Sequence, residues 1–326
     1  MNRFTFICVD QVVESMVKLT LTYDKRNQKD DYMNPAKKLH DLKPERQFFI
    51  GLDSDGCVFD TMEIKHKECF CPNFIEKFGL QSVSRYSREV WDFVNLYSKM
   101  RGCNRFLAVI WALDLLERKP EVVKRGTEVP KLTELRDWIK RETKLGNPAL
   151  LKEMETNKAP EFDIVYDYSI SVNNTIERMV HGIPPFPYVR ECLDKVEDLA
   201  DMIVVSQTPV EALEREWKEH GIDKYVKVIA GQELGTKTEH IAFAAVGKYP
   251  LDQILMVGDA PGDLKAAKEN NVLFYPINPG NEDASWERLY NEGLDRFFNK
   301  SYSGEYETAL IDEFQTYLPE LPPWEV

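Results

Sequence analysis

The chain has 326 residues, of which 43% are hydrophobic, so it is long enough to build two domains with separate cores. Its formal net charge of −13 argues against a nucleic-acid backbone as the principal partner, because such a partner demands clustered cations. No segment reaches the ~18 apolar residues expected of a membrane helix, so we expect no membrane partner.

Residues 1–45 are expected to form a poorly ordered N-terminal extension. Its apolar start is interrupted by Asp10 and Glu14, which makes it a poor signal peptide. The stretch from 23 to 46 is charged and low in apolar residues, as is typical of a loose arm. We assign this extension no function.

The segment Phe48–Gly56 carries the most informative pattern. Its apolar run predicts a strand buried on both faces, of the kind that parallel sheets use. Asp53 and Asp55 follow at the end of the strand, where open α/β folds bind ligands. Two buried acids are unfavourable unless their charge is compensated, usually by a divalent cation. Taken alone, the pattern fits an ordinary Asp-rich turn equally well.

About 150 residues separate this acid pair from the next buried strand, far more than an ordinary crossover needs. Strand-like alternation is nearly absent from residues 63 to 180, and apolar residues recur there at helical spacing. The stripes are Val90, Val94 and Tyr97; Phe106, Val109, Ile110, Leu113 and Leu116; and Leu132, Leu135, Trp138 and Ile139. We therefore predict an all-helical inserted domain.

Between two of these helices, Arg101 and Arg105 flank a glycine-containing loop. Such a loop could reach toward a ligand, where an arginine would suit an anionic group. The alternative is a plain helix connection with solvated arginines. We choose Arg101 as the candidate ligand-binding residue.

A second buried strand ends at Ser206, which Gln207 follows. Thr208–Glu211 then reads as a capping box with proline at the first helical position, so a helix N-terminus and its anion-binding N–H groups should lie at the strand end. A second capping box, Thr236–Glu239, places Lys237 in the first turn of another helix.

A third buried strand, residues 254–258, ends in Asp259, and Asp263 follows four residues later. Residues 209–220, 237–247 and 262–270 are predicted helices, alternating with strands at 225–230 and 272–277. This alternation predicts a parallel Rossmann-like sheet with helices on both faces and the acid-bearing strands at its centre.

The order acid pair, hydroxyl, lysine, acid pair resembles the four motifs of the haloacid dehalogenase-like superfamily of phosphohydrolases. The matching residues are Asp53-Ser54-Asp55-Gly56, then Ser206, then Lys237, and finally Gly258-Asp259 with Asp263. The resemblance covers roughly residues 47–62 and 183–278. The insertion resembles the caps that close over the active site and set substrate choice in this family.

The resemblance implies a role for each matching residue. Asp53 would be the nucleophile that forms an aspartyl-phosphate, and Asp55 the general acid and base. Ser206, Gln207 and Lys237 would hold the phosphoryl oxygens. Mg²⁺ would be held by Asp53, the backbone carbonyl of Asp55, Asp259 and Asp263, all hard oxygen donors.

We therefore expect a Mg²⁺-dependent phosphatase that hydrolyses a small soluble phosphomonoester. Within the family resemblance, Asp55 favours phosphate ester hydrolysis or intramolecular phosphoryl transfer, since dehalogenating relatives lack an aspartate at that position. A phosphomutase or phosphotransferase with the same intermediate stays open, as does a catalytically quiet binding protein. The expected layout is an α/β core over 46–62 and 183–300, a helical cap over 63–182, and a C-terminal tail over 301–326.

The cysteines are scattered, and the pair Cys69 and Cys71 lacks the spacing of a structural zinc site. Free thiols in a reducing cytosol fit this usage, so we expect a cytoplasmic protein. No sustained heptad pattern is present, which leaves the oligomeric state open.

Overall fold

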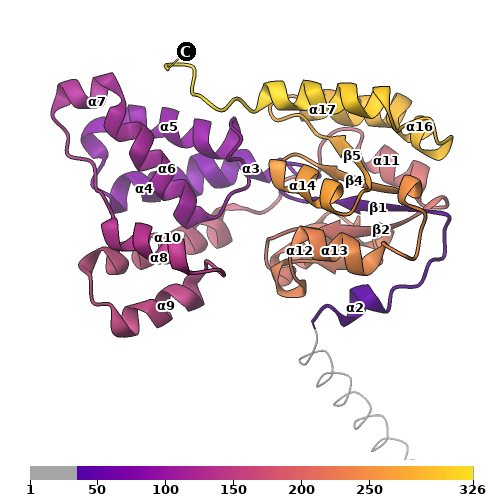
Figure 1. Ribbon diagram of the computed structural model, residues 1–326, viewed down its shortest axis with the longest axis horizontal. Coiled ribbons are helices and arrows are strands. Elements are labelled where there is room, and N and C mark those ends of the chain that lie inside the picture. Colours follow the sequence, from indigo (N-terminus) through magenta and orange to yellow (C-terminus); the bar gives the residue numbers. More distant parts are fainter. Residues whose placement is uncertain (1–34, 326) are drawn as a thin grey trace, which may run out of the picture.

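The computed structural model describes residues 35–325, and these form an α/β domain beside an all-helical one (Figure 1). Within this range the sheet has five parallel strands in the order β3-β2-β1-β4-β5. The strands are β1 (Phe48–Leu52), β2 (Ala200–Val205), β3 (Val228–Ala230), β4 (Ile254–Gly258) and β5 (Leu273–Pro276). The predicted Rossmann-like fold class is confirmed, with the acid-bearing strands β1 and β4 side by side at the centre.

Every side chain of β1 is buried, because the sheet is covered on both faces. Phe48, Ile50 and Leu52 join one apolar cluster, while Phe49 points into another. The first face is covered by α11 (Val189–Val196), α12 (Val210–Glu219), α15 (Glu282–Arg288), the π-helical segment η6 (Leu289–Gly293) and α16 (Leu294–Phe298). The second is covered by α2 (Lys37–His40), α13 (Lys237–Ala244) and α14 (Pro261–Glu269).

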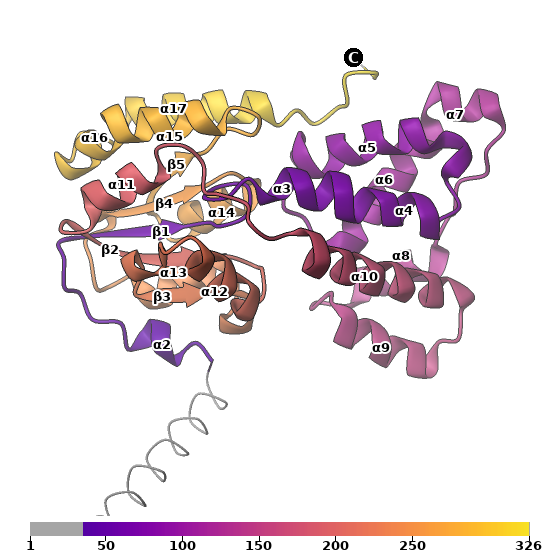
Figure 2. The same ribbon diagram turned by 180° about the vertical axis from the view of Figure 1, so that it is seen from behind.

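The helical domain is inserted between β1 and β2, as Figure 2 shows from behind. Its elements are α3 (Thr61–Ile64), the π-helical segment η1 (Lys65–Phe70), α4 (Cys71–Lys77), α5 (Ser84–Leu96), α6 (Arg105–Arg118), α7 (Pro120–Arg125), α8 (Thr133–Arg141), α9 (Asn147–Thr156) and α10 (Pro160–Met179). The three predicted apolar stripes fall on α5, α6 and α8. The domain has its own core around the buried rings of Trp91, Trp138 and Tyr168.

Short one-turn segments complete the secondary structure. They are the 3₁₀ helices η2 (Gln81–Val83), η3 (Asp223–Tyr225), η4 (Gln232–Leu234) and η5 (Leu251–Gln253). The segment η3 ends at Tyr225, where the predicted 225–230 strand begins, and the observed strand β3 starts only at Val228. No helix within residues 35–325 is both long and apolar enough to cross a bilayer.

Both predicted terminal segments contain residues that pack against the core. Of the predicted N-terminal extension, residues 1–34 lie outside the described range, while Leu39 and Leu42 are buried against the core. Of the predicted tail, residues Glu305–Tyr317 form helix α17, which packs on β5 through Leu310 and Phe314. The division into domains at the predicted boundaries stays a prediction.

Candidate active site

Asp53 lies at the carboxyl end of β1 and is almost fully buried, with 4% of its surface exposed. Its backbone N–H donates to the carbonyl of Val257 in β4 at 3.0 Å, which extends the sheet by one bond and fixes the start of the loop. Its Oδ1 accepts from the N–H of Ser54 at 2.8 Å. Asp53 is therefore held rigidly at the sheet edge by backbone groups.

Lys237 pairs with two carboxylates at once. Its Nζ lies 2.7 Å from Oδ2 of Asp53 and 2.6 Å from Oδ1 of Asp263. The predicted capping box is present: the side chain of Thr236 accepts from the N–H of Glu239, and Lys237 is the first residue of α13. Burial alone would lower the pKa of Lys237, but the charges of Asp263 and Asp53 outweigh it and raise that pKa.

Asp53, Asp259 and Asp263 form one buried acidic cluster in which one carboxylate oxygen from each residue lies within 4.8 Å of the other two. Burial and the repulsion of Asp263 raise the pKa of Asp53 to about 7. Burial likewise raises the pKa of Asp259 to about 7, against the opposing charge of Arg101. Among residues 35–325, the buried Oδ1 of Asp259 finds no hydrogen-bond partner. Three hard oxygen donors at this spacing, one of them unsatisfied, fit a divalent cation.

Asp55 points away from this cluster and is bound by three donors. Its carboxylate accepts from Thr61 Oγ1 at 2.5 Å and from Thr208 Oγ1 at 2.7 Å, and it forms an ion pair with Lys65. Burial would raise its pKa, but the charge of Lys65 and these hydrogen bonds lower it to about 2. The Asp55 carboxylate is therefore ionised in this arrangement, and it is the acceptor in each of these hydrogen bonds.

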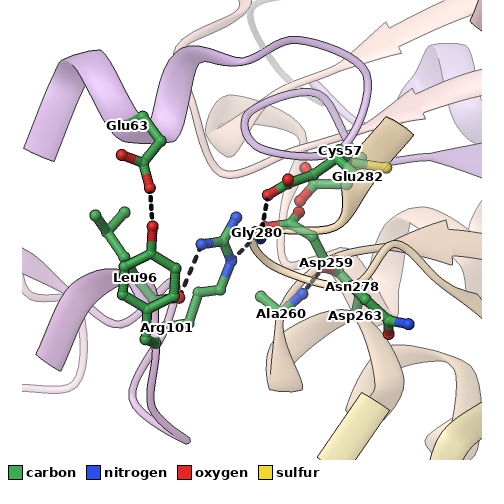
Figure 3. A network of polar contacts seen from close by, with 12 residues as sticks. Cys57, Glu63, Leu96, Arg101, Asp259, Ala260, Asp263, Asn278, Gly280 and Glu282 are labelled. Carbon is green, nitrogen blue, oxygen red and sulfur yellow. Dashed lines mark hydrogen bonds and ion pairs between the residues drawn. The ribbon is translucent and has the colours of Figure 1, made fainter. Parts of the chain in front are cut away.

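Arg101 reaches from the helical domain to the acidic cluster, as Figure 3 shows. Its Nε donates to Oδ2 of Asp259 at 2.6 Å and its Nη1 to the carbonyl of Leu96 at 2.9 Å. Both charged side chains are almost fully buried, at 2% and 1% exposure. The predicted role of Arg101 in substrate binding stays a prediction, and its observed partner is a candidate metal ligand.

The remaining predicted residues meet at the same sheet edge. Ser206 extends β2, with its N–H donating to the carbonyl of Ala230 at 2.9 Å, and its Oγ accepts from the N–H of Thr208 at 3.2 Å. The Nε2 of Gln207 donates to the carbonyl of Gly235 at 3.0 Å. Asp53, Asp55, Ser206, Gln207, Lys237 and Asp259 all line one cavity of about 1160 Å³.

This cavity lies between the two domains, since residues of the helical domain complete its walls. They include Lys65, His66, Arg105, Asn147 and Asn173. Cavities of this order hold small organic ligands in other proteins. The arrangement can therefore enclose a small molecule with one end on the acidic cluster and the other against the helical domain.

Sequence reasoning missed several residues of this site. Thr208 was predicted to cap a helix, but α12 begins at Val210 with no side-chain cap, and the Thr208 hydroxyl bonds to Asp55 instead. That prediction was wrong because the acid competes for the same hydroxyl. Thr61 and Lys65 stand four residues apart, a spacing that puts both on one face of a helix. This spacing is the sequence signal that could have identified them as partners of one group.

Glu216 on α12 was also missed. It lines the cavity, and its Oε2 accepts from the hydroxyl of Ser54 at 3.2 Å. Burial, with the nearby charge of Asp55, raises its pKa to about 7. In the sequence it stands in an ordinary run of charged residues, so nothing there distinguishes it from a solvated surface acid.

Comparison with known families gives one match, over residues 138–276, to the model of haloacid dehalogenase-like hydrolases. The matched range runs from α8 through β5 and contains Ser206, Lys237, Asp259 and Asp263. No curated protein sequence matches the chain.

Solved structures similar to this chain include a haloacid dehalogenase-like family hydrolase from Xanthomonas campestris, at 11% identity and a TM-score of 0.42, over 80% of this chain and 96% of that one. A protein provisionally named phosphoglycolate phosphatase from Lactobacillus delbrueckii subsp. bulgaricus has 14% identity and a TM-score of 0.45, over 78% and 98%. CbbY from Rhodobacter sphaeroides, solved with phosphate, has 14% identity and a TM-score of 0.36, over 70% and 85%.

Proposed function

We propose that this chain, which is a haloacid dehalogenase-like hydrolase, is a Mg²⁺-dependent phosphatase that acts on a small phosphomonoester through an aspartyl-phosphate. The observation that carries the proposal is the placement of Asp53. Its carboxylate pairs with the Lys237 ammonium, forms a cluster with two further buried acids, and lines the cavity between the domains. Asp55 lies two residues further on, and the proposed reaction uses it as the general acid and base.

In the first step, a carboxylate oxygen of Asp53 attacks phosphorus and the ester P–O bond breaks. The departing oxygen takes the electron pair and receives a proton from Asp55. Lys237 and Ser206 bind the phosphoryl oxygens, and Lys237 offsets the charge that builds up around Asp53.

In the second step, a water attacks the phosphorus of the aspartyl-phosphate, Asp55 takes up its proton, and phosphate leaves. The ionised form of Asp55 in this structure is the form that can accept that proton. To donate a proton in the first step, Asp55 must release Lys65. The substrate phosphate is a competing partner for Lys65, since this lysine also lines the cavity.

The acidic cluster supports the metal requirement. Asp53, Asp259 and Asp263 would hold Mg²⁺, together with the predicted backbone carbonyl of Asp55. A bound Mg²⁺ would neutralise charge on the transferring phosphoryl group and orient it. Without it, the cluster relies on Lys237 and Arg101 for compensation. The five described cysteines are free thiols, which agrees with the proposed cytoplasmic location.

The test is phosphate release from a panel of phosphomonoesters, with and without Mg²⁺, for wild type and Asp53→Asn. We expect turnover that needs the metal and falls by at least about 10³-fold in the variant, because the nucleophile is lost. Turnover that survives Asp53→Asn would contradict the proposed nucleophile. Transfer of phosphate to a second alcohol in place of water would redirect the assignment to a phosphotransferase.

A further inference from the structure

Arg105 places a positive charge in the part of the cavity formed by the helical domain. It is the first residue of α6, whose positive end therefore lies at the same place. Its guanidinium lies over the ring of Phe70, 5.3 Å from the centroid. Packing on this ring holds the side chain in one orientation.

The polar partners of Arg105 are all neutral. Its Nη1 donates to the carbonyl and the hydroxyl of Ser169, at 3.2 and 3.0 Å, and to Oδ1 of Asn173 at 2.7 Å. Among the carboxylates of residues 35–325, none lies within ion-pair distance of it, in contrast to Arg101 with Asp259. Burial lowers the pKa of Arg105, and no carboxylate offsets that effect.

The surroundings of Arg105 do not neutralise it. Burial lowers the pKa of the adjacent His66 to about 3, so the imidazole is uncharged. Its buried Nδ1 has no hydrogen-bond partner within the described part of the chain. Asn147 and Asn173, which also line the cavity, carry no charge. Glu177 lies one turn beyond Asn173 on α10 and lines the same cavity, without an ion pair to Arg105.

We infer that Arg105 forms a second anion-binding subsite, which takes a carboxylate or a second phosphate on the organic part of the substrate. An unpaired guanidinium beside a helix N-terminus, in a cavity that also contains an unsatisfied imidazole nitrogen, is suited to an anionic group. The inference rests on the proposed function, because that places the phosphoryl group at Asp53, on the opposite domain.

The structure thereby assigns the anion-binding role to Arg105 in place of Arg101. Arg101 lies in the connection between α5 and α6, and Arg105 is the first residue of α6. Arg101 is paired with Asp259. The hydrogen bonds of Arg105 to described residues all come from its Nη1, so its Nη2 and Nε can bind a ligand. The substrate class that follows is a phosphomonoester with a second negative charge at its far end.

The experiment compares kcat/KM of the Mg²⁺-loaded full-length protein on two matched pairs of esters. The first pair is 3-phosphoglycerate and glycerol 3-phosphate, which differ by a carboxylate against a hydroxymethyl group. The second is propane-1,3-diol bisphosphate and its monophosphate. In one pair we expect the member with the second anionic group to be favoured by about tenfold or more. A preference in the first pair would identify a carboxylate subsite, and one in the second pair a phosphate subsite.

Arg105→Gln should bring that ratio close to one, and Arg105→Lys should keep part of it. Arg136→Gln is the matched control: it removes one cation of the helical domain that pairs with Asp114 outside the cavity, so the wild-type ratio should persist. A wild type that prefers the member without the second anionic group in both pairs, or an unchanged ratio in Arg105→Gln, would overturn the inference.

Titration calorimetry of the same esters with Asp53→Asn separates this inference from the proposed function. Tighter binding of the anionic members, lost when Arg105→Gln is added, would support the subsite even if no ester is turned over. Equal binding of both members of each pair would refute the subsite while leaving phosphatase activity untouched.

Discussion

At the level of single residues, the site is defined by charges that are buried close together. Asp53 and Asp259 have a pKa of about 7 because burial disfavours their ionised forms and Asp263 and Asp53 repel them, respectively. A carboxylate ordinarily titrates near 4. The metal-free cluster therefore retains protons at pH values where surface acids have lost theirs.

This predicts that Mg²⁺ binding releases protons below pH 7. Since the cation needs ionised carboxylates, its apparent affinity should fall as the pH drops below about 7, by up to roughly tenfold per pH unit for each proton displaced, and should level off above pH 8. Calorimetric titration at pH 6, 7 and 8, in buffers of different ionisation enthalpy, measures both quantities. An affinity that does not change from pH 6 to 8 would contradict the raised pKa values.

Gly56 is the residue whose size matters most in the first loop. It has φ +77°, and an added Cβ would lie 2.5 Å from Nη2 of Arg101 and 2.8 Å from Oδ2 of Asp259. The loop after β1 can therefore pass this ion pair only as glycine.

Gly56→Ala should reduce phosphatase activity by more than about tenfold, because it displaces Arg101 and Asp259 in addition to straining the backbone. Gly79→Ala is the control, since its φ is +68° and nothing lies within 4 Å of the added Cβ. That variant should lose about 1 kcal/mol of stability and keep its activity. Equal activities in the two variants would contradict a specific effect of the Gly56 methyl group on Arg101 and Asp259.

At the level of helices and loops, the connection between α5 and α6 joins the helical domain to the acidic cluster. It delivers Arg101 to Asp259 in a contact from which water is almost wholly excluded. Removing one partner of such a pair leaves an uncompensated buried charge. Arg101 therefore compensates the cluster and contacts the opposite domain at the same time.

We predict that Arg101→Met lowers the melting temperature of the metal-free protein and increases the stabilisation that Mg²⁺ provides. The cation then meets carboxylates that no longer share Arg101. Differential scanning calorimetry with EDTA and with saturating Mg²⁺ gives both numbers. Arg136→Met, which breaks a more exposed pair with Asp114, should change the melting temperature little and the Mg²⁺ effect not at all.

Across the molecule as a whole, the chain end links the two domains. After α17 the chain leaves the core and reaches the helical domain (Figure 1). There the ring of Trp324 lies 3.7 Å from Nζ of Lys119 and edge-on to Phe93, and Glu325 pairs with Arg118 at 2.7 Å. Since α17 packs on β5, this segment ties α5 and α6 to the core.

Trp324→Ala should release this tie and speed amide hydrogen exchange in α5 and α6, with a stability loss of about 1 to 3 kcal/mol from lost aromatic and cation–π contacts. Leu321→Ala is the matched control, because Leu321 belongs to the same segment and is 53% exposed. Exchange mass spectrometry resolves the two helices. Unchanged exchange in Trp324→Ala would show that the tail does not restrain the domain.

The sheet and its acidic edge follow from local patterns in the sequence. Each central strand is an apolar run, and parallel strands deliver their last polar residues to the same edge. Asp53 and Asp259 are identifiable from the sequence on that ground, while Lys237 and Asp263 are identified by the family resemblance. The capping box at Thr236 is likewise a local device, with all its bonds inside four residues. Apolar strands and capping boxes depend on residues that are close in the chain, so they can be predicted from the sequence.

What faces those residues from other elements is set by tertiary packing. Thr208 and Lys65 bind Asp55, and Arg101 binds Asp259. Arg105 meets no carboxylate among the described residues and bonds only to neutral groups. Arg101 and Arg105 look equivalent in the sequence. In the structure Arg101 pairs with the buried Asp259, whereas the described partners of Arg105 are neutral. Long-range pairing of this kind depends on how the helical domain packs against the core, which no local pattern encodes.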